Sequence, residues 1–523
     1  MGVRVVLKWR KVIFRRIFRL SSFWAVVIAL LVFYLFLAGR LLTHFPPLNP
    51  DEVVIGVTSD SYIHGHGTNY SLYDTIFAPS AYSIRGVTTQ ESRIFYAFWV
   101  GLWTRCLSRS VTHLRWSTLS LGAGVLLVFF MMGRGLQGPS LGLLCVLLVL
   151  ANPVFWAASC VTQEHMALLL GATSIMALAV GTPAFRWKKF ILGVLMGLST
   201  GFHPNMAVFF MGMAVFYPCL FPDERPLSAI VLLTCGFLAG TLLALAPVDL
   251  TRYLQFQNTL YWQFAKPPIL SKPWTPMTWI QSTLMTCFRG PTYYFDSTVS
   301  GWRQSLGVYW AAAGLSLVGL VGRKSRASRA LGLGLLMTFV GLALLVKRQE
   351  MVYGLIVLPF LIPLMGLGWE AHPRSARIVS VLIFIAGLGC FGIFAHRYAR
   401  RGKSFEQVRR EIQVLAPEEN LKIAGPNFLW LMYPNRPIRD IGAMINSRYY
   451  TGGESDLGGW LGQWQPDVLF VSPLFKRIFL GAGPGEPALR RILGASSVHL
   501  LGTVIAMDPY GPFEVYRIEW PKK

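Results

Sequence analysis

Long apolar runs, joined by short basic connections, dominate the first 400 residues of the chain. A helix needs about 20 predominantly apolar residues to cross the ~30 Å hydrocarbon core of a bilayer. Runs of this kind cover residues 22–42, 112–133, 140–158, 165–181, 227–247, 304–322, 328–346, 351–369 and 376–397. The pattern predicts a polytopic α-helical membrane protein.

A longer apolar stretch, 189–220, is interrupted by His203-Pro204-Asn205. It is either one kinked helix or two short helices that meet at the break. Cytoplasmic loops carry an excess of Lys and Arg, so the basic N-terminal segment is placed in the cytoplasm. Two short helices keep the basic loop 323–329 on that side, whereas one helix moves it outside. We therefore predict about eleven transmembrane helices in the plasma (inner) membrane, with the N-terminus cytoplasmic and the C-terminus extracytoplasmic.

The first run follows a basic segment, as the apolar part of a signal peptide does. It lacks a convincing small-residue cleavage site and is long enough to cross the membrane, so we interpret it as a retained helix.

The seven cysteines lie mostly inside apolar runs and do not have the spacing of metal ligands. This pattern favours a role as small apolar side chains.

Composition supports a membrane protein and argues against a nucleic-acid binder. Apolar residues make up 54% of the chain and charged residues 14%, whereas soluble domains carry about 25% charged residues. The formal net charge is +24, but residues 404–523 are nearly neutral. The excess basic residues lie at the ends of apolar runs, where membrane topology places them, and not on a polar domain.

Three segments are predicted outside the cytoplasm: loops 43–111 and 248–303 of a transmembrane domain (1–403), and a small α/β domain (404–523). In the first loop, an amphipathic helix over 91–107 is expected to lie at the membrane interface, with Phe95, Trp99 and Trp103 on its apolar face. The alternative is a helix packed on other loops. In the C-terminal domain, strands are expected at Lys422–Ala424, Asp467–Val471, Val504–Met507 and Phe513–Ile518, and helices at Phe405–Leu415 and Pro487–Leu493.

The pair Asp51-Glu52 follows the first apolar run, in a turn stiffened by Pro50. A carboxylate near the membrane surface can serve as general base for a hydroxyl or amide acceptor. Its neighbour can hydrogen-bond the acceptor or tune the pKa of the base through like-charge repulsion. The alternative is ordinary loop charge, which we prefer for Asp60, Asp74 and Asp296.

Other polar residues are predicted on the same face of the membrane. Glu164, His165, Asn205 and Arg93 are assigned to substrate binding, and His203, Lys347, Arg348 and Tyr353 to an anionic phosphate at the lipid–water boundary. Lys and Arg are usually enriched on the cytoplasmic side, so basic residues on the opposite side suggest a specific role. The structural alternatives are snorkelling for Lys347 and Arg348 and a packed, hydrogen-bonded imidazole for His203.

This arrangement resembles the GT-C superfamily of glycosyltransferases, and within it the protein O-mannosyltransferases and the lipid A aminoarabinose transferases. The likeness covers residues 20–400 in organisation, and Asn49-Pro50-Asp51-Glu52 is its most specific part. Supporting segments are Ala151–Trp156 leading to Gln163-Glu164-His165, Gly193–Leu198, and Lys347-Arg348 ahead of Tyr353 and Pro359. The chain departs from these relatives at His203, where they commonly have Lys, and at Glu164, where Asp is more familiar.

The resemblance implies a polyprenyl-phosphate sugar donor that enters from the outer leaflet. It also implies inverting transfer with Asp51 as base and Glu52 in support, and stabilisation of the departing phosphate by Lys347, Arg348 and His203. We expect no metal and no other cofactor, although oligosaccharyl-transferring relatives use a metal. The acceptor is a protein, a lipid or a glycan, and nucleic acid is not expected as a partner. The competing interpretations are a transporter or lipid flippase, and an inactive subunit with the same fold.

Overall fold

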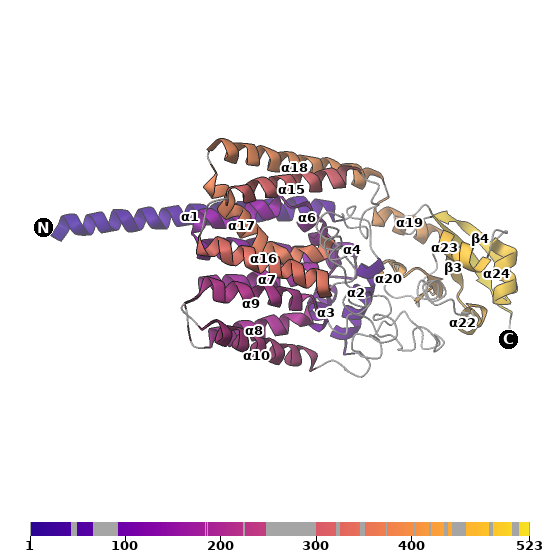
Figure 1. The fold of residues 1–523 in the computed structure, drawn as a ribbon. Helices are drawn as coiled ribbons and strands as arrows, with labels where there is room; N and C mark the ends of the chain where they lie inside the picture. Colours follow the sequence, from indigo (N-terminus) through magenta and orange to yellow (C-terminus); the bar gives the residue numbers. More distant parts are fainter. Residues whose placement is uncertain are drawn as a thin grey trace.

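The computed structural model describes most of the chain. The described residues are 2–42, 50–65, 93–183, 185, 187–222, 225–246, 300–320, 325–345, 351–372, 374–401, 403–417, 420–433, 438–441, 457–480, 485–504 and 512–521. They form a bundle of helices with a small domain containing a β-sheet at the end opposite the N-terminus (Figure 1).

The helices of the bundle follow the apolar runs closely. The first part of the chain forms α1 (Gly2–Leu41), α2 (Pro50–Ile63), α3 (Ile94–Cys106), α4 (Val111–Leu136), α5 (Pro139–Leu150), α6 (Pro153–Ser159), α7 (His165–Gly181), α8 (Lys188–Leu198), the 3₁₀ helix η2 (Ser199–Gly201), α9 (Met206–Leu220) and α10 (Pro226–Leu245). The second part forms α15 (Ser300–Val318), α16 (Arg326–Leu345), the 3₁₀ helix η4 (Met351–Val357), α17 (Leu358–Ala371) and α18 (Arg374–Arg401).

Within the described ranges, five helices are long and apolar enough to cross a membrane: Ser22–Leu41, Val111–Leu136, Pro226–Leu245, Arg326–Leu345 and Gly354–Ala371. A sixth crossing results if α5 and α6 are counted as one span bent by 72°. Pro153 has no backbone N–H to continue α5, and the Asn152 carboxamide accepts hydrogen bonds from the amides of Val154 and Phe155 to start α6. The protein is therefore an integral membrane protein. The apolar run 140–158 forms two helices, α5 and α6, and not one straight helix.

The predicted break at His203-Pro204-Asn205 is present. Helix α8 ends at Leu198, η2 continues it for one turn, and α9 begins at Met206. The interpretation as two helices is confirmed. The break lies beside α3, since the ring of Phe95 contacts that of Phe202 with centroids 5.7 Å apart.

Glycines hold α8 against α10. Gly193 and Gly197 on α8 face Gly236 and Gly240 on α10, and a Cβ at any of the four would come within 2.1–2.3 Å of a backbone oxygen of the other helix. Both helices thus carry the small-xxx-small spacing that lets membrane helices approach at backbone distance.

Two short helices, α2 and α3, lie between the bundle and the C-terminal domain (Figure 1). The predicted turn at Asp51-Glu52 is wrong in its local structure, because Pro50 opens a helix and both acids lie in its first turn. Proline suits this position because its missing N–H has no partner there in any helix. Helix α3 packs on α2, and a Cβ on Gly101 would lie 2.6 Å from the carbonyl oxygen of Ser59. Its other side is partly exposed, with Phe98 47% accessible, and its place at the membrane interface stays a prediction.

The C-terminal domain is a small α/β fold. It contains α19 (Phe405–Leu415), β1 (Ile423–Gly425), α20 (Leu429–Met432), β2 (Ile438–Asp440), α22 (Leu457–Trp464), β3 (Val468–Val471), α23 (Pro473–Phe475), the π-helix η5 (Lys476–Leu480), α24 (Gly485–Leu493), β4 (Ser497–Val504) and β5 (Phe513–Glu519). The strand order is β2-β1-β3-β5-β4. The strands β2, β1 and β3 are parallel, and β5 and β4 are antiparallel.

The strand predicted at Val504–Met507 lies outside the described residues except for Val504, which is the last residue of β4. Most of β4 was not predicted. Strand β2 was missed, because Pro437 and the turn-forming residues before it dominate the local pattern.

The C-terminal domain shares a hydrophobic core with the bundle. Val53 and Val57 of α2 lie in the same buried cluster as Trp430 of α20 and Phe513 of β5. Trp430 lies against α2, since a Cβ on Gly56 would come within 3.2 Å of its indole. The guanidinium of Arg109 lies 5.2 Å from the centre of the same ring. This core fixes α2, and with it the two acids of its first turn, between the bundle and the domain.

Candidate functional site

The two acids at the start of α2 have opposite environments. Glu52 is buried, whereas Asp51, the preceding residue, is exposed. The Glu52 carboxylate accepts two hydrogen bonds from the guanidinium of Arg115 on α4, from Nε to Oε2 at 2.9 Å and from Nη2 to Oε1 at 2.8 Å. Both side chains are 1% exposed. A bidentate pair of this kind is among the strongest and most directional contacts of a protein interior.

Arg115 and Glu52 also bind the backbone on either side. Arg115 Nη1 donates to the carbonyl of Leu42, just after α1, at 2.8 Å. Glu52 Oε2 accepts from the amide of Thr162, just before α7, at 2.8 Å. The pair therefore joins the ends of α1, α2, α4 and α7 at one point. It orients the first turn of α2, from which Asp51 projects.

A second polar cluster lies a few residues after Thr162. Glu164 forms an ion pair with Arg93, which precedes α3, through Oε1 and Nη1. His203, from the break between α8 and α9, brings Nε2 to 3.7 Å from the same carboxylate oxygen and to 3.5 Å from Arg93 Nη2. His165 lies beside it, with ring centroids 5.5 Å apart. Four of the residues predicted from the sequence are thus brought together.

His203 faces a hydrogen-bond donor at each ring nitrogen. The amide of Asn205 donates to His203 Nδ1 at 3.0 Å. The guanidinium of Arg93, which can only donate, lies 3.5 Å from Nε2, the atom that also faces Glu164. Asn205 acts here through its backbone, and its side-chain nitrogen is buried without a hydrogen-bond partner among the described residues.

The structure gives less information on the remaining predicted residues. Lys347 and Arg348 lie outside the described residues, as do Asp74 and Asp296. Tyr353 lies in η4, where only its backbone is described. Asp60, predicted to be a solvated loop charge, lies in α2 and forms a 2.7 Å ion pair with Arg109.

Glu164, His165 and His203 are also the residue types that bind a transition metal, and their ligand atoms lie within 4.8 Å of one another. The hydrogen bonds do not fit a metal. Both ring nitrogens of His203 already face donors, Nδ1 the Asn205 amide and Nε2 the Arg93 guanidinium. Arg93 already supplies a cation to Glu164 Oε1. The geometry therefore favours the guanidinium as the positive partner of this carboxylate.

Arg115 was missed by the sequence analysis. A signal was present, because Arg115 is a charged residue inside the apolar run 112–133. Ionisable residues within membrane helices are costly and usually have a specific partner. Its partner, Glu52, is 63 residues away along the chain, so the pairing was visible only in the fold.

Comparison with solved structures identifies the architecture. ArnT from Cupriavidus metallidurans, a lipid A aminoarabinose transferase, superposes in its apo form with a TM-score of 0.58 at 13% identity, over 96% of this chain and 100% of that one. The fold is that of the GT-C enzymes. The form of ArnT bound to undecaprenyl phosphate gives a TM-score of 0.57 at 13% identity and the same coverage.

A weaker match is the Archaeoglobus fulgidus oligosaccharyltransferase. Its apo form has a TM-score of 0.49 at 11% identity, over 85% of this chain and 69% of that one. No protein-family model and no curated protein matches the sequence. At 13% identity the likeness to ArnT shows the fold alone, and the chemistry must be argued from the site.

Proposed function

We propose that the protein is a glycosyltransferase that moves a sugar from a polyprenyl-phosphate donor to an acceptor outside the cytoplasm. The observation that carries the proposal is the exposed Asp51 carboxylate next to a buried, doubly hydrogen-bonded Glu52, at the start of α2. A base must be held in a fixed direction and remain accessible to the acceptor. The likeness in fold to ArnT, captured with undecaprenyl phosphate, supports the lipid-phosphate donor.

In the proposed reaction, the Asp51 carboxylate accepts the proton of the acceptor hydroxyl or amine as that group attacks the anomeric carbon. The bond between this carbon and the phosphate oxygen breaks in line with the attack. The electron pair leaves with the polyprenyl phosphate, and the anomeric configuration inverts. Glu52 is buried and bound to Arg115, so we assign it the positioning of Asp51 and no contact with the acceptor.

The second cluster is proposed to face the donor. Arg93 is held by Glu164 beside His203, so its guanidinium offers fixed positive charge and hydrogen-bond donors. Such donors stabilise the charge that develops on a leaving phosphate. Lys347, Arg348 and Tyr353 keep their proposed place in phosphate binding from the sequence alone, and His165 is proposed to pack beside the donor.

For the topology, we propose eleven crossings, in residues 1–403, and an accessory domain in residues 404–523. The five long helices and the bent pair supply six crossings. We assign four more to the shorter apolar helices in α7, α9, α15 and α18, and the last to α8 extended by η2. The basic N-terminal segment is then cytoplasmic, and Asp51 and the C-terminal domain, both at the opposite end of the bundle, are outside (Figure 1).

The test of the reaction uses purified protein in liposomes with a panel of radiolabelled polyprenyl-phosphate sugars and membrane extracts as acceptor. Wild type is expected to transfer label from at least one donor, and Asp51→Asn to lose at least 100-fold of this rate. Asp60→Asn, on the same helix but paired with Arg109, is the matched control and should keep most of it. Transfer that persists in Asp51→Asn would refute the mechanism, and no transfer from any donor would favour a transporter or an inactive subunit.

The topology has its own test. In a cysteine-free background, Arg490→Cys places a thiol on the exposed side of α24. It should react with a membrane-impermeant maleimide in intact cells. Protection in intact cells with labelling after lysis would place the C-terminal domain in the cytoplasm and contradict the proposal.

A further inference from the structure

A pocket of about 380 Å³ lies where α17 ends and α18 begins. Trp369, in the last turn of α17, forms one wall. The remaining lining residues belong to the first turns of α18 and are Arg374, Arg377, Ile378, Val381 and Leu382. This junction is at the end of the bundle that carries the N-terminus, away from Asp51 (Figure 1).

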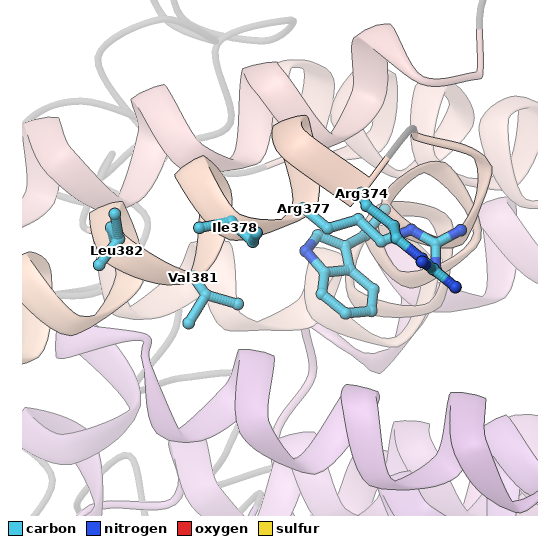
Figure 2. A pocket seen from close by; sticks show the side chains of 6 residues that line it. Arg374, Arg377, Ile378, Val381 and Leu382 are labelled. Atoms are coloured by element: carbon cyan, nitrogen blue, oxygen red, sulfur yellow. The ribbon is translucent and has the colours of Figure 1, made fainter.

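The α18 residues of the pocket form one continuous face. Their spacing of three, one, three and one residues places them on one side of an α-helix. Along the helix axis, this face changes from basic to apolar side chains. The two arginines lie at one end of the pocket beside the indole, and Ile378, Val381 and Leu382 extend away from them (Figure 2). These three apolar side chains are 62%, 42% and 59% exposed.

The cationic end is built on a fixed support. Arg377 Nε donates to the carbonyl of His372 at 2.8 Å, and Nη2 donates to the carbonyl of Glu370. Its guanidinium also lies 5.5 Å from the centre of the Trp369 ring. These contacts tie the first turn of α18 to the end of α17 and leave the N–H groups of Nη1 for another acceptor. Arg374 is exposed one turn earlier and has no ion-pair partner within the described residues.

The neighbouring carboxylate does not neutralise this end. Glu370 Oε2 accepts from Gln137 Nε2, beyond the end of α4, at 2.7 Å. Its side chain is thus engaged with another part of the bundle. Two guanidinium groups beside this one carboxylate leave a net positive charge at the pocket.

We propose that this pocket binds a phospholipid with an anionic headgroup. The phosphate accepts hydrogen bonds from Arg374 and Arg377, and an acyl chain lies along Ile378, Val381 and Leu382. A lipid fits better than a free phosphate ion because an exposed apolar wall continues from the cationic end for about 7.5 Å of helix at 1.5 Å per residue. A tryptophan beside arginines is also typical of the level of the lipid headgroups. The proposal does not depend on the transferase activity, and its site is separate from Asp51.

The test measures lipid binding to the full-length protein. Native mass spectrometry of detergent-solubilised protein, titrated with phosphatidylglycerol, should show a bound lipid whose dissociation constant rises about tenfold in Arg374→Ala. Arg134→Ala, which removes an exposed arginine from the last turn of α4, is the matched control and should bind as wild type does. Leu382→Asp tests the apolar wall without touching the arginines, and should also weaken binding.

The possible results separate the lipid from other occupants. Equal binding of phosphatidylglycerol to wild type, Arg374→Ala and Arg134→Ala would overturn the proposal. Equal affinity for phosphatidylcholine would also overturn it, because the arginines would then select no charge. Displacement of the lipid by millimolar inorganic phosphate as readily as by a short-chain phosphatidylglycerol would identify a free-anion site instead. Loss of binding in both Arg374→Ala and Leu382→Asp, with the control unaffected, would support a bound phospholipid.

Discussion

Arg115 and Glu52 form a bidentate ion pair in which each side chain is 1% exposed. The partners come from different helices, and each also binds backbone just outside a third or fourth helix. A charge pair at this depth gives little net stability, because removing two ions from water offsets much of their attraction. Its effect is directional, because it holds the α2 turn that carries Asp51 in one orientation.

Breaking this pair on one side should destabilise the protein strongly. Glu52→Gln leaves the Arg115 guanidinium buried without a counter-charge, and a loss of about 3–5 kcal/mol is expected. Thermal unfolding in detergent measures it. Asp60→Asn, which breaks a more exposed pair on the same helix, should cost about 1 kcal/mol or less. Equal losses of stability in the two variants would show that breaking the buried pair costs no more than breaking the more exposed one.

The double variant Glu52→Leu/Arg115→Met separates stability from positioning. Replacing a buried ion pair by apolar side chains of similar size is often neutral for stability. Stability should therefore return close to that of wild type. Transfer should stay low, because the Thr162 amide loses its acceptor and nothing directs the first turn of α2. Recovery of both properties would show that Asp51 needs no orienting group.

Arg93 should not be replaceable by lysine. Lysine keeps the charge but loses the planar fork that contacts Glu164 and lies beside His203. Arg93→Lys should lower kcat by about 10–100-fold with a smaller change in KM, if the group acts on the leaving phosphate. Arg105→Lys, exposed at the far end of the same helix, is the control. A variant changed only in KM would place Arg93 in ground-state binding.

Chelation should leave the reaction unchanged. Arg93 supplies the cation at Glu164 and also lies beside His203 Nε2, so incubation with EDTA followed by desalting should retain the full rate of transfer. Metal analysis of the purified protein should find far less than one equivalent of zinc, manganese or magnesium. Loss of activity that a divalent metal restores would show that Glu164, His165 and His203 hold an ion after all.

Trp430 should couple the C-terminal domain to α2. Trp430→Ala removes the indole that contacts Gly56 and lies under Arg109, and should accelerate amide hydrogen exchange in residues 51–63. Trp520→Ala is the control, because Trp520 packs on the separate cluster at the other side of the domain. If both variants behave alike, α2 responds to the stability of the domain and not to this contact.

The sequence predicted most of the helices because apolar length and charged loops are local properties. It also predicted that Arg93, Glu164, His165 and His203 belong to one site, from their shared side of the membrane. It did not separate Asp51 from Glu52, because adjacent residues of a turn look alike until the turn becomes helical and one side chain meets Arg115. The bend at Asn152-Pro153 was similarly hidden within a run of sufficient length to be one helix.

The close contact between α8 and α10 at Gly193, Gly197, Gly236 and Gly240 predicts which mutations abolish activity. None of these glycines approaches the reacting groups, yet they set the position of α8 and so of the break that delivers His203. One added methyl group would push the two helices apart. In a random mutagenesis screen for loss of activity, changes to alanine or serine at these four positions, which most membrane helices tolerate, should therefore recur among the inactive variants.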